Sequence, residues 1–68
     1  MQRSIQYTSD REYASIEELL ERKLDFLLHI EDKIAEANRA HNSAYASTLW
    51  KIQIDEERHA RMLRDLLV

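Results

Sequence analysis

The sequence predicts an all-α protein: an antiparallel two-helix hairpin that dimerises into a four-helix bundle. Three observations point to this fold. The 68 residues include no Gly and no Pro, so the usual helix breakers are missing. Leu, Ala, Glu and Arg are common, and aromatic residues make up only 7%, a mixture that favours helix over strand. Apolar residues also recur at spacings of three and four in two segments, as in amphipathic helices.

The length of the chain predicts one domain, residues 1–68, that gains stability from outside its own core. Chains this short rarely bury enough apolar surface, and most add disulfides, a metal or a partner chain. Disulfides are excluded because there is no Cys. We therefore expect a homodimer or higher homo-oligomer, a bound metal, or both.

Residues 1–14 are polar and aperiodic, so we expect a flexible N-terminal arm. Two capping boxes follow the Ser-x-x-Glu pattern, one from Ser9 to Glu12 and one from Ser15 to Glu18. Ser15 directly precedes the periodic region. We therefore expect the first helix to begin after Ser15 and to cover about residues 16–40.

The first helix carries an apolar stripe with two polar members. Its spacings alternate between four and three, as in a bundle seam. The stripe consists of Leu20, Leu24, Leu27, Glu31, Ile34 and Asn38.

A turn is expected at His41, Asn42 and Ser43. Asn tolerates the left-handed conformation that ends helices, and Ser is a good N-cap for the next helix. The competing interpretation is one uninterrupted helix over residues 16–67.

The second helix is expected over about residues 44–67, nearly as long as the first. Equal lengths suit an antiparallel hairpin, and two hairpins make a four-helix bundle. Its stripe consists of Tyr45, Leu49, Ile52, Glu56, His59, Leu63 and Leu66.

Glu31, Glu56 and His59 are polar residues within these apolar stripes. A carboxylate in such a seam is costly unless it is paired or bound to a cation. Inward-facing Glu and Glu-x-x-His from neighbouring helices form di-metal sites in bundles. The midpoint between Glu31 and Glu56 falls at the turn, so the two should lie level. We therefore predict a metal site in which two chains supply four Glu and two His, a set that suits iron or manganese.

The residues around these ligands resemble a known family. The segment 49–63, with Glu56 and His59 as its Glu-x-x-His, is similar to the second metal-binding helix of rubrerythrin-type proteins of the ferritin-like superfamily. The segment 30–37 is similar to their first helix, with Glu31 as the bridging ligand. The half-length chain also resembles encapsulated ferritins, which build a four-helix bundle from two chains. The resemblance implies a di-iron carboxylate site at a dimer interface, with a ferroxidase, peroxide-reducing or iron-handling role.

The alternative function is a non-catalytic dimerisation or adaptor module. In that case the polar residues of the seam would form buried salt bridges that set the register of the helices.

Composition argues against two other partner classes. The net charge is −3 and the pI is near 5.5, unlike the basic footprint of a nucleic-acid-binding protein. The apolar runs are too short for a membrane span. Residues 1–5 lack the apolar core of a secretory signal, so we expect a cytoplasmic protein.

Overall fold

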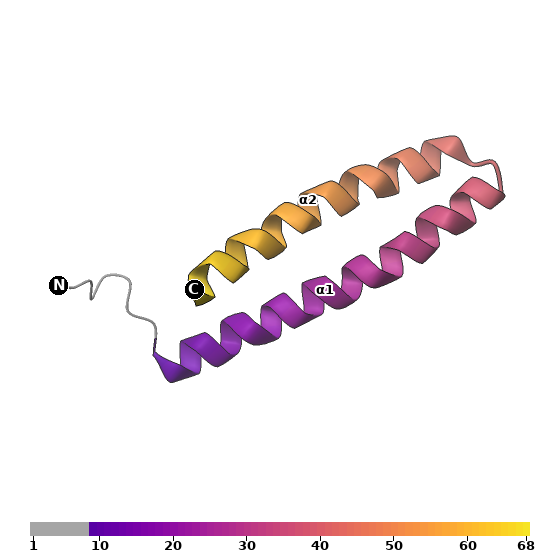
Figure 1. Ribbon diagram of the computed structural model, residues 1–68. Helices are drawn as coiled ribbons and strands as arrows, with labels where there is room; N and C mark the ends of the chain where they lie inside the picture. Colours follow the sequence, from indigo (N-terminus) through magenta and orange to yellow (C-terminus); the bar gives the residue numbers. More distant parts are fainter. Residues whose placement is uncertain (1–8) are drawn as a thin grey trace.

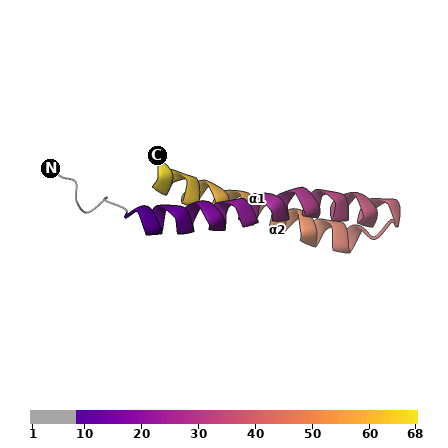
Figure 2. The same ribbon diagram turned by 90° about the horizontal axis from the view of Figure 1, so that it is seen from below.

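The chain folds as two helices packed side by side and connected by a tight turn. The computed structural model describes residues 9–68. Helix α1 spans Asp10–Arg39 and helix α2 spans Ser43–Leu67. They run in opposite directions along most of their length (Figure 1), and a perpendicular view shows a single layer in which they cross at a small angle (Figure 2). The all-helical hairpin is thus confirmed, and the interpretation as one continuous helix is wrong.

Helix α1 begins six residues earlier than the sequence analysis predicted. Ser9, not Ser15, is the N-cap: its Oγ accepts a hydrogen bond from Glu12 N, and its own N–H donates to Glu12 Oε1, both at 3.2 Å. The outer capping box is favoured because the added turn reaches α2, where the Tyr13 hydroxyl donates to the Leu67 carbonyl at 3.2 Å. Residues 10–14 are therefore helical, while the rest of the expected flexible arm, residues 1–8, lies outside the described residues.

The turn lies where the sequence predicted it, but its residues exchange roles. His41, with φ of 59°, takes the left-handed conformation that we expected of Asn. Asn42 is instead the N-cap of α2, and its side-chain oxygen accepts from Tyr45 N at 3.1 Å. Asn42 N also donates to the Ala37 carbonyl at 2.9 Å, which ties the turn to the end of α1.

The two helices meet along a seam with regular heptad spacing. Its members are the buried and half-buried residues of each helix that alternate at spacings of three and four. In α1 they are Ile16, Leu20, Lys23, Leu27, Ile30, Ile34 and Ala37. In α2 they are Ala46, Leu49, Gln53, Glu56, Ala60, Leu63 and Leu67.

The predicted stripes are wrong at alternate positions. Ile30 is only 3% exposed, whereas Leu24 of the predicted stripe is 49% exposed and Glu31 is also exposed. Apolar residues on both sides of the seam blur the periodicity, because Phe26, Leu27 and Leu28 follow one another. In α2, too, every other residue of the predicted stripe lies beside the seam and not in it. Those exposed are Tyr45, Ile52 and Leu66, at 48%, 39% and 58%.

The hairpin buries little of its apolar surface. Among the described residues only Ile30, Ala37, Ala46 and Ala60 are buried, and three of these are small. Small side chains let two helices approach closely, but they add little apolar area. In the described part of the chain, twelve large apolar side chains remain at least 39% exposed. Neither helix has a stretch long and apolar enough to cross a membrane.

Candidate functional site

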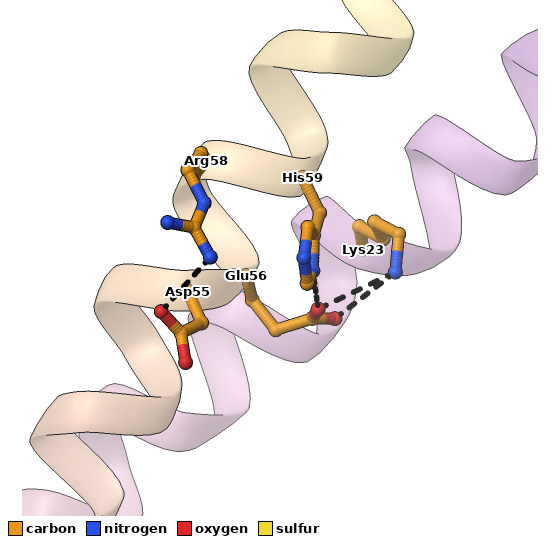
Figure 3. Close-up of polar contacts among 5 residues, drawn as sticks. All are labelled: Lys23, Asp55, Glu56, Arg58 and His59. Atoms are coloured by element: carbon orange, nitrogen blue, oxygen red, sulfur yellow. Dashed lines mark hydrogen bonds and ion pairs between the residues drawn. The ribbon is translucent and has the colours of Figure 1, made fainter.

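Glu56 is the acidic residue of the seam, and it pairs with Lys23 of α1 (Figure 3). The Lys23 ammonium lies 3.2 Å from Glu56 Oε2 and 3.4 Å from Oε1. Their side chains are 31% and 22% exposed. The contact joins residues 33 positions apart in the sequence, so it forms only when the helices pack in this register.

His59 lies one turn further along α2 and faces the same carboxylate (Figure 3). Its Nδ1 lies 2.9 Å from Glu56 Oε1. An ionised carboxylate only accepts hydrogen bonds, so Nδ1 must carry the proton. The neutral ring then has its lone pair on Nε2. Because the side chain of His59 is 44% exposed, this polar cluster of Lys23, Glu56 and His59 begins in the seam and reaches the surface.

These neighbours hold the pKa of Glu56 below its ordinary value. The hydrogen bond from His59 is the largest cause, and the hydrogen bond and positive charge of Lys23 act in the same direction. Partial burial acts against them, because it disfavours the charged form. At neutral pH Glu56 is therefore an ionised carboxylate.

Glu31 is the predicted ligand that the structure does not bring to this cluster. The Lys23–Glu56 contact fixes which parts of the helices lie level. Glu31 is eight residues closer to the turn than Lys23, which is about 12 Å along the helix axis. Within one chain, therefore, the structure brings Glu56 and His59 together and leaves Glu31 apart.

Glu31 also lies on the opposite side of the seam from His59. Each helix turns about 100° per residue, so residues directly before and after a seam position point to opposite sides. Glu31 follows Ile30, whereas His59 precedes Ala60. Leu24, which shares the side of Glu31, lines an open groove with Glu57 of α2, and this contact shows which sides of the two helices adjoin.

These two sides are the two broad faces of the two-helix layer, and their chemistry differs. We call them the histidine edge and the groove edge. The histidine edge is defined by the residues Leu19, Phe26, Tyr45, Ile52, His59 and Leu66. The groove edge is defined by the residues Glu17, Leu24, Glu31, Trp50, Glu57 and Arg64. Within each helix the members are seven residues apart. The histidine edge is mainly apolar, whereas four of the six residues of the groove edge carry charge.

Lys23 is the site residue that sequence reasoning missed. The sequence could have indicated it, because Lys23 lies three residues after Leu20 and four before Leu27, which is the spacing of a seam position. Asp55, one residue before Glu56, is not part of the cluster, because its carboxylate lies 3.3 Å from the Arg58 guanidinium (Figure 3).

Within residues 9–68, no three His, Asp or Glu side chains come together in a group that could hold a metal. Imidazole and carboxylate are suitable iron ligands, but Lys23 already neutralises the carboxylate of Glu56. The residues of one chain thus fit a di-iron centre only in part. The predicted site draws on two chains, so it stays a prediction.

The chain matches no family model, no curated protein and no solved structure in the three comparisons made. Similarity to known proteins therefore adds nothing to the resemblance described above.

Proposed function

We propose that this chain is an association module that pairs with a second copy of itself to form a four-helix bundle. The main supporting observation is that, within residues 9–68, only four residues are buried, whereas twelve large apolar side chains are at least 39% exposed. Burial of apolar surface is the main source of stability in small domains, and short chains often obtain it by oligomerising. A second hairpin laid on the first would cover side chains that the two-helix layer leaves in water.

The polar cluster has a natural role in such a module. An ion pair in a helical seam contributes little net stability, because both charges lose hydration. Its best-attested effect is to select one register, since any slip leaves a partly buried charge without its partner. The cluster of Lys23, Glu56 and His59 would thus fix the shape of the surface offered to the second copy.

Sedimentation equilibrium at micromolar concentration tests the proposal. We expect a dimer or a larger species whose melting temperature rises with protein concentration, because association stabilises the folded chain by mass action. A helical monomer whose melting temperature does not depend on concentration would contradict the proposal.

A second candidate function is metal binding, and the Glu56–His59 pair favours it. A histidine that donates Nδ1–H to a carboxylate is oriented for ligation through Nε2, as in many metal sites. This candidate needs a pairing of the chains that brings Glu31 of the second chain to the cluster, and the metal then competes with Lys23 for Glu56. The resemblance implies a di-iron protein with a ferroxidase, peroxide-reducing or iron-handling role. Manganese suits the same ligand set, and we expect the protein in the cytoplasm.

Anaerobic titration with ferrous iron tests this candidate. A metal site predicts tight binding of about one metal per chain and a higher melting temperature in the presence of iron. The double variant E31Q/E56Q should lose the binding, whereas the matched variant E17Q/E57Q, which changes two exposed carboxylates, should keep it. A wild-type protein that neither binds iron nor melts at a higher temperature would reject the metal site and leave the association module unaffected.

A further inference from the structure

We infer that the histidine edge is the surface through which two copies pair, antiparallel to one another, with His59 on the two-fold axis. This inference rests on the association proposed above and adds which surface is used and in which register. It follows from the chemistry of the two edges, the size of the face and the symmetry of its residues.

The chemistry favours the histidine edge over the groove edge. Its five apolar side chains are each 39–58% exposed, so each has surface left to bury. Pairing through the groove edge would instead bring Glu17, Glu31 and Glu57 into an interface. Unpaired carboxylates lose hydration there without compensation.

The size of the face is sufficient for a stable dimer. The 25 residues of α2 give a face about 38 Å long, and two helices packed side by side make it roughly 18 Å wide. Two such faces would bury on the order of 1,400 Å² in total, which lies within the range of stable protein interfaces.

The row of residues on α2 meets the geometric requirement for a second copy. A two-fold interface must be complementary to itself. On α2, Ile52 and Leu66 each lie seven residues from His59. An axis at His59 therefore places Ile52 against Leu66 of the second copy, and His59 against its own counterpart.

Helix α1 repeats this symmetry within one helical turn of the same level. Leu19 and Phe26 lie four residues before and three after Lys23, whose partner Glu56 is one turn from His59. The same axis thus places Leu19 against Phe26 of the second copy. Glu12 and Lys33 continue this row at its two ends, so the axis also brings opposite charges together.

Single charges placed on either edge test which surface is used. Ile52 of the histidine edge, 39% exposed, is matched on α2 by Ile54, which is 42% exposed and lies on the other side of the seam, after Gln53. Phe26 of the histidine edge and Leu24 of the groove edge, 42% and 49% exposed, form the matching pair on α1. We expect I52E and F26E to raise the dimer dissociation constant at least tenfold, because each buries a carboxylate. The controls I54E and L24E should change it less than about threefold. Circular dichroism reports whether each variant keeps its helices.

The outcomes separate this inference from the proposed function. A monomeric wild-type protein would overturn both. A dimeric wild-type protein that I54E and L24E dissociate, while I52E and F26E do not, would overturn the histidine edge alone. Dissociation by neither pair would also overturn it.

Cross-linking tests the register without placing a charge in the interface. The chain has no Cys, so a single introduced Cys is the only thiol. At the two-fold axis, H59C should join to its own counterpart through a short bismaleimide. L66C should not, because its counterpart lies fourteen residues, or about 21 Å, along the bundle. Equal cross-linking of both variants would overturn the antiparallel arrangement.

Discussion

His41 closes the turn in a conformation that favours glycine. Its φ of 59° brings Cβ close to the backbone, which costs about 1 kcal/mol for most residues. The chain contains no Gly, so it accepts this strain at the one position where the helices reverse direction.

The His41→Gly variant should therefore stabilise the hairpin. We expect the free energy of unfolding to rise by up to about 0.5 kcal/mol, which is what remains of the relieved strain after allowing for the greater freedom of Gly in the unfolded chain. Urea denaturation at fixed protein concentration measures the change. The control His29→Gly, on the exposed surface of α1, should lower it by about 0.5 kcal/mol. A loss in both variants would mean that the turn is not strained.

Each helix was recognisable from its periodicity, but its inward face was not. Helix α1 contains apolar residues on both sides of the true seam, such as Leu24 and Phe26. Several stripes at spacings of three and four can be drawn through such a helix. The stripe that becomes buried is the one whose partner stripe on α2 offers the best packing.

Truncation of two neighbouring residues of α1 tests the seam. Ile30→Ala removes a side chain that is 3% exposed and should lower the free energy of unfolding by about 2–4 kcal/mol. Leu28→Ala removes one that is 67% exposed and should change it by less than about 0.5 kcal/mol. Thermal or urea denaturation at one protein concentration compares them. Similar losses would show that the helix presents another face to its partner.

For the whole molecule, the cluster between the helices makes stability depend on pH. The pKa of Glu56 is lowered in the folded chain by His59 and then by Lys23. The unfolded chain therefore takes up a proton more readily than the folded chain. The folded chain loses stability as the pH is lowered. The contribution of Glu56 is complete above the ordinary Glu pKa of about 4.3 and is lost as the pH falls through the lowered value.

Comparison of the wild-type protein with Glu56→Gln measures this contribution. The amide keeps the shape of the side chain but has no charge, so the variant should be less stable at pH 7. The difference in free energy of unfolding should shrink as the pH falls below about 4. Denaturation curves at several pH values measure it. The control Glu57→Gln alters an exposed neighbour and should show a small difference at every pH. A difference for Glu56→Gln that persists unchanged into acid would contradict the assigned pairing.

The candidate site was predictable to the extent that it is local. The sequence picked out Glu56 and His59 as a pair because residues three apart share a helix face, and they lie 2.9 Å apart. Glu31 was assigned because the midpoint between Glu31 and Glu56, which falls between Ser43 and Ala44, was taken to lie at the turn, whereas the loop between the helices is residues 40–42. That error, together with the misplaced stripe, separated Glu31 from the cluster.

The sequence by itself determined the secondary structure and the position of the reversal. Helix propensity, capping residues and apolar period act over a few residues, so they can be read locally. Only the tertiary structure decided three features. They are the use of the first capping box, the residues that form the seam, and the pairing of Lys23 with Glu56. Each depends on contacts between residues more than thirty positions apart, and such contacts exist only once the two helices have chosen which faces to bury.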